Sequence, residues 1–374
     1  MALSDVNVKV NLITRTGLEP VWFPLFIVVD SSQPALNKAI PYTECSTLQE
    51  LASLLADYKD SDSRKERKEK EEKVKKTSLY HAIEVMFLQD GHPNKFAVLN
   101  IKDAGEDAFA KVKEELDPYL DRNWRQLVLL TSYPESLNYQ LAEYIENIEQ
   151  RKMFYFGCSS TDYAVFSETE GGKTYNLNDY TRTVAVYHPN DTNSGRYPVA
   201  AVIGAVSGKT PGSLNYRNCI VNNIPPVALT EEELDTLHNL GFITLVERAG
   251  DTVISTGKSA SGERYIDTID IEDYVVQNLI YNTQKALNEN DIVPYNNDGI
   301  SILENAAVSV MLDCCSKGMI AKTDTNTYEY NVDYPAIQFV PEEDIASREY
   351  KLGTVSFIVQ GAIDRVEITV DMAL

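Results

Sequence analysis

The feature that most constrains the fold is an alternation of short apolar runs with amphipathic segments through residues 21–206. Five apolar runs have the length and composition of buried β-strands: residues 21–29, 96–101, 126–131, 153–157 and 183–187. Helical patterns lie between them, from about residue 47 and at residues 106–116, 134–149 and 197–206. Parallel strands need such crossover helices. The sequence therefore predicts an α/β fold with a mainly parallel sheet and helices on its faces.

A charged segment interrupts this alternation. Residues 64–73 read RKERKEKEEK and carry a charge at every position. Three Glu–Lys pairs stand four residues apart in the order that stabilises a helix: Glu66 with Lys70, Glu69 with Lys73 and Glu72 with Lys76. We expect a solvated helix over residues 59–76, and a disordered loop is the alternative.

The second half of the chain has a different pattern. Thr230 and Glu233 form a capping box for a short helix, and residues 242–255 read as a β-hairpin turning at residues 249–251. Two amphipathic helices follow, joined at residues 294–299, with Asp298 as the expected N-cap of the second. This pattern is α+β in character and predicts a second domain.

Both ends of the chain alternate apolar and polar residues as strands do. The apolar positions are Val6, Val8, Val10 and Leu12 at the start, then Val355, Phe357, Val359, Ile363, Val366, Ile368 and Val370 at the end. Ordering about 18 residues costs ~18–36 kcal/mol of backbone entropy. About ten ladder hydrogen bonds return only ~5–15 kcal/mol. We therefore expect both arms to pair with the sheet of a neighbouring copy, and pairing inside their own subunit is the alternative.

These patterns divide the chain into four segments. We expect an N-terminal strand arm at 1–18, an α/β domain at 19–228, a C-terminal assembly domain at 229–352 and a C-terminal strand arm at 353–374.

Charge and composition exclude several function classes. The net charge of −22 argues against nucleic acid as a partner. Residues 228–346 hold 22 acidic and 6 basic residues, a net charge of −16, which suits a basic partner surface as well as simple solvation. No apolar run approaches the ~18 residues of a membrane span, so we expect no membrane insertion. The five scattered cysteines read as reduced thiols.

Catalytic motifs are difficult to find. Ser207-Gly208-Lys209-Thr210 lacks the earlier glycine that a phosphate loop needs. The four histidines have no metal-ligand spacing. Cys158 and Ser159 follow a predicted buried strand, where an α/β enzyme could keep a nucleophile, but the sequence names no partner base. We expect no catalytic residues, no cofactor and no metal ion.

The order of elements in residues 180–374 resembles the contractile tail sheath proteins of bacteriophages and related injection systems. The resemblance rests on an ordered set of segments: Tyr187-His188-Pro189, Pro211-Gly212-Ser213, the predicted hairpin, Thr256-Gly257-Lys258, Arg264-Tyr265-Ile266-Asp267 and Gly361-Ala362-Ile363-Asp364-Arg365-Val366-Glu367-Ile368. The first half is similar only in the order of its elements.

This resemblance implies a subtilisin-like α/β domain without protease residues, followed by a sheath assembly domain with terminal β-arms. It implies a structural subunit, not an enzyme, that polymerises as hexameric rings around a tail tube and contracts to drive the tube through a target envelope. The implied partners are further copies of the chain, the tail tube protein, and baseplate and tail terminator proteins. The implied location is the virion tail, assembled in the host cytoplasm. Two alternatives stay open: an α/β hydrolase-like enzyme using Cys158 or Ser159, and a non-contracting phage tail structural protein.

Overall fold

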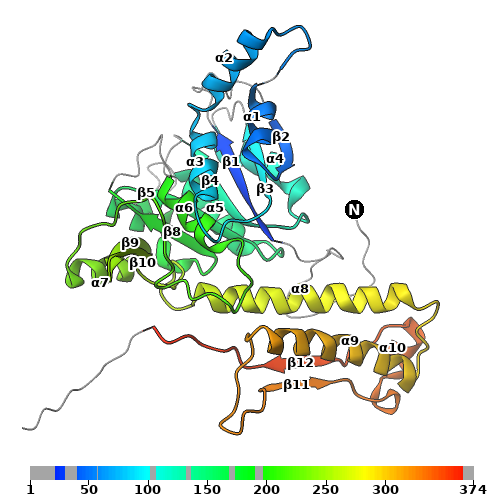
Figure 1. Ribbon diagram of the computed structural model, residues 1–374. Helices are drawn as coiled ribbons and strands as arrows, with labels where there is room; N and C mark the ends of the chain where they lie inside the picture. The colour runs from blue at the N-terminus through cyan, green and yellow to red at the C-terminus, as the bar shows by residue number, and fades with distance from the viewer. Residues whose placement is uncertain are drawn as a thin grey trace, which may run out of the picture.

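The computed structural model describes residues 22–29, 40–56, 58–101, 107–131, 136–167, 173–189 and 197–364. Figure 1 shows these residues as a sheet with helices, referred to as the sheet body, and a second body that begins with the long helix α8 (Ile266–Glu289). The sheet has eight strands in the order β10-β9-β8-β5-β4-β1-β3-β2. Their bounds are β1 Phe23–Val29, β2 Ile40–Cys45, β3 Phe96–Ile101, β4 Trp124–Thr131, β5 Met153–Cys158, β8 Thr183–Tyr187, β9 Phe242–Arg248 and β10 Asp251–Ile254.

The strands between the two edges of this sheet are parallel, as the sequence predicts. Only the edge strands β2 and β10 run antiparallel to their neighbours β3 and β9. All seven residues of β1 are buried, because β1 lies between β3 and β4 and is covered on both faces. Phe26 and Val28 point into one apolar core, and Leu25 and Ile27 point into the other.

Helices cover each face of the sheet. The core on one face is completed by α1 (Leu48–Ala56), α3 (Ser78–Phe87) and α6 (Tyr197–Val206). The other core is completed by α4 (Ala108–Leu116), α5 (Ser136–Asn147) and α7 (Glu231–Asn239). The short strands β6 (Val165–Ser167) and β7 (Thr174–Asn176) form a separate hairpin.

The charged segment forms a short helix, α2 (Arg64–Val74), that projects from the sheet body (Figure 1). Ser63 and Glu66 form a capping box at its start, so the helix begins at Arg64, five residues after the predicted start at residue 59. Val74 is the one buried residue of α2, so the helix touches the rest of the chain along a narrow strip. We refer to residues 58–76 as the spur.

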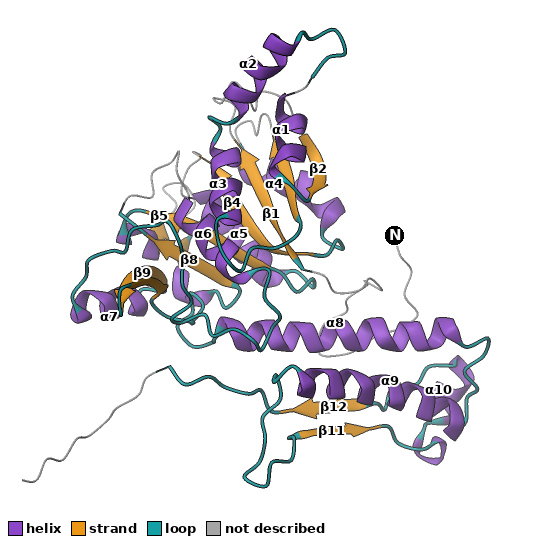
Figure 2. Cartoon of the chain, viewed as in Figure 1, coloured by secondary structure: helices purple, strands orange, loops and turns teal. Residues whose placement is uncertain are grey.

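The second body stacks a helical hairpin on a small sheet (Figure 2). Helices α8 and α9 (Asn297–Ser316) pack on strands β11 (Tyr330–Asp333) and β12 (Thr354–Phe357), and α10 (Glu342–Ser347) lies in the connection between those strands. Tyr330 and Val332 face the helices, whereas the alternate residues of β11 are exposed polar groups. Helix α9 is long and apolar enough to cross a membrane, but its apolar face packs in this core.

Two predictions about the second half are wrong. The expected domain boundary at 229 falls inside the sheet body, because β9 pairs in parallel with β8 and extends the eight-stranded sheet. The boundary lies at the start of α8 instead. The N-cap of α9 is Asn296, whose side chain accepts a hydrogen bond from the Gly299 N–H, and not Asp298. The capping box at Thr230 and Glu233 is confirmed.

Candidate assembly interface and domain junction

The predicted arm residues divide into two groups. Seven of them lie outside the described residues: Val6, Val8, Val10, Leu12, Val366, Ile368 and Val370. The other four, Val355, Phe357, Val359 and Ile363, are described, and the structure places them differently from one another.

Three of these residues pack inside their own subunit. Val355 stands opposite Val332, and Phe357 stands opposite Tyr330, in the antiparallel pair β11–β12. Val359 forms a β-bridge with Ile320. All three pack against the apolar core between α8 and α9. The prediction that the C-terminal arm begins at 353 is therefore corrected: its first half covers the chain's own helical hairpin, which would otherwise expose that core.

The chain leaves the second body after this bridge. Ile363 is 80% exposed, so it packs on little of its own subunit. Asp364 accepts a hydrogen bond of 3.0 Å from the Asn215 amide, which ties this segment to the sheet body. Residues 361–364 thus end the described chain with an exposed apolar side chain. Whether Ile363 pairs with another copy stays a prediction.

The small sheet of the second body has open edges. Within the described ranges, β11 and β12 pair only with each other, so each strand has a second edge without a partner strand. The sheet's outer face is polar and carries Asn331, Asp333, Thr354 and Ser356. An open edge of this kind can accept a strand from another chain through backbone hydrogen bonds.

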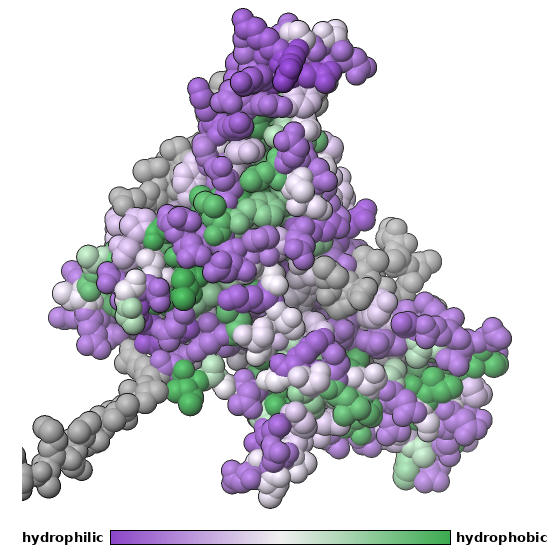
Figure 3. All heavy atoms as spheres, in the orientation of Figure 1, coloured by the Kyte–Doolittle hydropathy of each residue, from purple (hydrophilic) through white to green (hydrophobic). Residues whose placement is uncertain are grey.

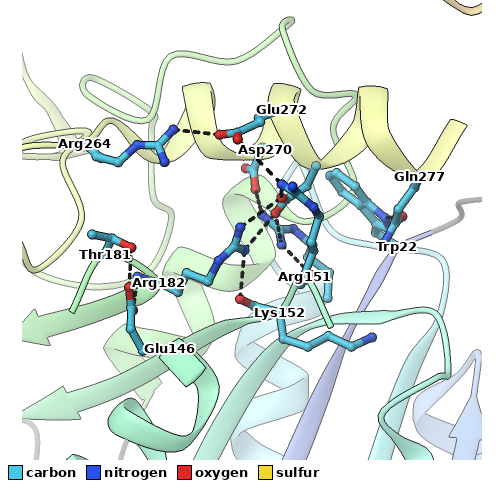
Figure 4. Close-up of polar contacts among 12 residues, drawn as sticks. Trp22, Glu146, Arg151, Lys152, Thr181, Arg182, Arg264, Asp270, Glu272 and Gln277 are labelled. Atoms are coloured by element: carbon cyan, nitrogen blue, oxygen red, sulfur yellow. Dashed lines mark hydrogen bonds and ion pairs between the residues drawn. The ribbon is translucent and has the colours of Figure 1, made fainter. Parts of the chain in front are cut away.

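A buried group of charges joins the two bodies, and sequence reasoning missed it. Arg125 lies in β4, while Arg151 and Arg182 lie just before β5 and β8. All three guanidinium groups converge on Asp273 of α8, a carboxylate that is fully buried. We refer to Arg125, Arg151, Arg182, Asp270 and Asp273 as the junction cluster, most of which appears in Figure 4.

The geometry around Asp273 is that of strong charge-assisted hydrogen bonds. Its two carboxylate oxygens lie 2.5 Å from Arg125 Nη1 and 2.6 Å from Arg151 Nη1. Arg182 adds a bidentate pair at 3.0 and 3.1 Å. Burial by itself would raise the pKa of Asp273, but the three arginines outweigh burial and hold the pKa well below its usual range.

Asp270 lies about one helical turn before Asp273 and pairs with one arginine instead of three. It accepts hydrogen bonds from Arg125 Nη2 at 2.7 Å and from the Tyr216 hydroxyl at 2.9 Å. Burial raises the pKa of Asp270 despite these partners. The same two acids, acting against burial, raise the pKa of Arg125. Arg125 therefore stays charged and holds both carboxylates of α8.

Lys152 lies behind the cluster. Its ammonium donates to the carbonyl oxygens of Arg122 and Trp124, each at 2.6 Å, and lies over the Trp124 ring at 4.3 Å. Burial, reinforced by the charge of Arg125, lowers the pKa of Lys152 to about 7.

A second set of contacts holds the next turns of α8. The Trp22 indole N–H donates to Gln277 Oε1 at 2.6 Å, and its ring meets Tyr274 edge to face. The Arg125 guanidinium lies over the Trp22 ring, 4.9 Å from its centre. Figure 4 shows Trp22 next to Gln277 of α8, at one side of the junction cluster. Helix α8 is therefore fixed to the sheet body along several turns.

The sequence carried only a faint signal of this junction. Asp270 and Asp273 interrupt the apolar face of α8, which includes Ile271 and Val275. Acidic residues at buried helical positions indicate buried basic partners. The sequence does not indicate that these partners are three arginines at or just before the starts of strands. The three arginines lie 26 to 57 residues apart along the chain.

The candidate catalytic residues have burial and contacts that do not suit catalysis. The Cys158 thiol is 2% exposed and points toward the Val186 carbonyl oxygen at 3.7 Å. His188 does follow the adjacent strand, but its Nε2 lies 3.0 Å from the Pro225 carbonyl oxygen. In Ser207-Gly208-Lys209-Thr210, the glycine serves packing, since a Cβ there would lie 2.3 Å from the His92 carbonyl oxygen. Across the described ranges, no group of three or more His, Cys, Asp or Glu residues could hold a metal ion.

Comparisons with known proteins agree on one fold. Three cryo-EM chains match this chain over nearly its whole length. A chain of the anti-feeding prophage baseplate, six-fold symmetrised, has a TM-score of 0.67 and 13% identity, covering 95% of this chain and 94% of that chain. A chain of the anti-feeding prophage helical sheath in the contracted state has a TM-score of 0.64 and 14% identity, covering 98% and 99%. A chain of the contracted PVC sheath complex, from an extracellular contractile injection system, has a TM-score of 0.65 and 12% identity, covering 99% and 96%.

The sequence itself matches no family model and no curated protein. The structural likeness therefore carries the comparison, and at these identities it shows the fold. The chain has the fold of contractile tail sheath proteins.

Proposed function

We propose, from this shared fold, that the chain is the repeating structural subunit of a contractile sheath. The observation that carries the proposal is that the likeness spans both bodies and 95–99% of this chain. A single α/β domain could serve many functions, because such folds host unrelated activities. A sheet body joined by a long helix to a small sheet with open edges is a more specific combination.

The proposed assembly uses the open edges of β11 and β12. The terminal segments of neighbouring copies, residues 1–18 and 361–374, add as strands to these edges and so link subunits into hexameric rings and a helical stack. Backbone hydrogen bonds supply the link, and the alternating apolar side chains supply the burial that orders the arms. The exposed Ile363 supports this arrangement.

The proposed contraction is a rigid-body movement of subunits around a tail tube, with the terminal arms keeping them connected. Such a movement needs a subunit that transmits force without bending between its two bodies. The junction cluster supports this requirement because it fixes α8 to the sheet with four charged hydrogen bonds on Asp273 and Trp22 on the next turns. The energy would come from a difference in contacts between subunits, so no nucleotide is required.

Charge supports a basic tube surface as the inner partner. The second body, residues 266–364, holds 17 acidic and 5 basic residues, a net charge of −12. We expect tube binding to weaken as ionic strength rises, because surface charges are screened. Co-sedimentation with the tube protein at about 0.05 M and 0.5 M salt measures this effect, and binding that is equal at both concentrations would contradict it. Baseplate and terminator proteins complete the proposed partners, in a virion tail assembled in the host cytoplasm.

We propose a structural role for the chain, not an enzymatic one. The burial of Cys158, the candidate nucleophile, weighs against a hydrolase. A non-contracting tail protein is the remaining alternative, and no contact in the structure favours it.

Polymerisation of the purified full chain tests the proposed function. We expect ultracentrifugation to pellet large polymers above a critical concentration, as open-ended assembly requires. A folded chain that stays monomeric at every concentration and salt, with and without tube protein, would overturn the proposal.

A further inference from the structure

The spur is a basic surface on an acidic molecule. Residues 58–76 hold nine basic and six acidic residues, a net charge of +3, whereas the whole chain carries −22. Figure 3 shows α2 as a hydrophilic projection at one extremity of the molecule. A charge of opposite sign to the rest of the chain, held away from the body, points to a partner surface that is acidic.

One face of the spur concentrates this basic charge. Arg64 and Lys68 are four residues apart, a spacing that places them along one side of α2, and both are exposed. Lys75 lies further along the same side and pairs with Glu72 at 3.2 Å, and Glu71 accepts a hydrogen bond from the Tyr58 hydroxyl at 2.6 Å. Several acidic side chains of the spur are engaged by partners within the spur, so they do not face a neighbouring molecule. Glu66 caps the helix, and Asp62 pairs with Lys70 at 2.6 Å.

The most acidic helix of the sheet body is α7. Glu231, Glu232, Glu233 and Asp235 are exposed within a nine-residue helix that contains no lysine or arginine. Glu233 completes the capping box with Thr230, so its carboxylate is engaged. Glu231 and Glu232 lie in the first turn of α7 and are both exposed, so a basic partner can reach them.

These two surfaces lie at opposite edges of one sheet. Helix α2 packs on α1, which packs on the edge strand β2, whereas α7 packs on β9 near the other edge. Six strand spacings separate β9 from β2. At about 4.8 Å each, they place the two helices roughly 29 Å apart or more, beyond the reach of a side chain. The basic and acidic helices of one molecule therefore cannot pair with each other.

We propose that the spur of one copy docks on α7 of a neighbouring copy. Such a contact joins two different surfaces head to tail, and repeated contacts of this kind build rings or helices. The inference rests on the proposed self-assembly and adds to it a lateral contact between sheet bodies, separate from the strands of the second body. The spur–α7 contact sets the orientation of neighbours and the salt dependence of assembly.

Charge reversal on the spur tests the contact. The variant Arg64→Glu/Lys68→Glu should raise the critical concentration for polymerisation by at least about tenfold at low salt, because it places like charges opposite α7. The matched control is Lys111→Glu/Lys113→Glu on α4, which changes the net charge equally at one half-buried and one exposed position, on a helix other than α2 and α7. Circular dichroism checks that both variants keep the fold.

A compensating change separates the contact from a general charge effect. Adding Glu231→Lys/Glu232→Lys to the spur variant restores opposite charges across the contact. We expect this combined variant to recover a critical concentration within about threefold of the wild type, while the α7 change alone impairs assembly as the spur change does.

The outcomes distinguish this inference from the proposed function. If the wild type polymerises and the spur variant assembles like the α4 control, the spur–α7 contact is overturned and the sheath proposal stands. If the combined variant stays as impaired as the spur variant, the contact is also overturned. If the wild type forms no polymer under any condition, both proposals are overturned together.

Discussion

At the scale of single residues, Asp273 is the point where the two bodies meet. Its carboxylate takes hydrogen bonds from Arg125, Arg151 and Arg182, with no exposure to solvent. A buried pair is not in itself a source of large net stability, since desolvation offsets attraction. Removing one partner is costly, however, because the others are left charged and buried. The junction is therefore most sensitive at its single shared carboxylate.

Asp273→Asn should lower the free energy of unfolding by about 3–5 kcal/mol, because three guanidinium groups lose their common counter-charge. Urea denaturation at neutral pH measures the loss. Glu289→Gln is the control, since Glu289 lies on the same helix but is exposed and pairs with the exposed Lys285 at 3.7 Å. Its loss should stay within about 1 kcal/mol. Equal effects of the two changes would contradict the role given to Asp273.

Lys152 predicts a pH dependence. Its pKa is about 7 in the folded chain, whereas an unfolded lysine titrates near 10.4. Between these values the unfolded state binds more protons, so stability should rise with pH by up to about 1.4 kcal/mol per unit. Lys152→Met removes this titration. We expect the difference in unfolding free energy between wild type and variant to shift in favour of the wild type from pH 7 to 10. Parallel pH profiles would refute the assignment.

At the scale of elements, the C-terminal strand region has two roles that its sequence does not separate. Residues 353–360 and 362–370 both alternate apolar and polar residues, yet β12 pairs with β11 of the same chain. The reason is that β12 covers the apolar face of α8 and α9, which would otherwise be exposed to solvent. Alternation predicts a strand but does not say which edge the strand meets.

This division predicts the effect of a truncation. Removing residues 361–374 should leave the melting temperature within about 2 °C of the wild type, because β12 and the Val359 bridge remain. The same truncation should abolish polymerisation in a pelleting assay. A longer truncation from residue 354 is the comparison, and it should unfold the second body because it removes β12 from the core. Polymers from the shorter truncation would show that assembly does not need this arm.

A matching prediction applies to the start of the chain. Deleting residues 1–18 should give a folded monomer that does not polymerise, because the described core begins at Trp22, after the deleted segment. Circular dichroism and sedimentation velocity measure the two properties together. Normal sheath formation by the truncated chain would be evidence against the arm model.

At the scale of the whole molecule, the sheet body could be predicted from the sequence because its strands are buried on both faces and alternate with helices. The runs at 96–101 and 183–187 match β3 and β8 residue for residue. The boundary between the bodies could not be predicted, because a hairpin next to a capped helix reads the same whether it extends a large sheet or starts a new domain. The junction cluster also could not be predicted, because its partners come from separate strands that only the fold brings together.

The measurement that tests the central claim most directly is negative-stain electron microscopy of the purified full chain, alone and with its tail tube. The account predicts hollow, striated cylinders of uniform width, with six-fold symmetry in end views. Particles that remain folded monomers, or aggregates without regular width or striation, would contradict it.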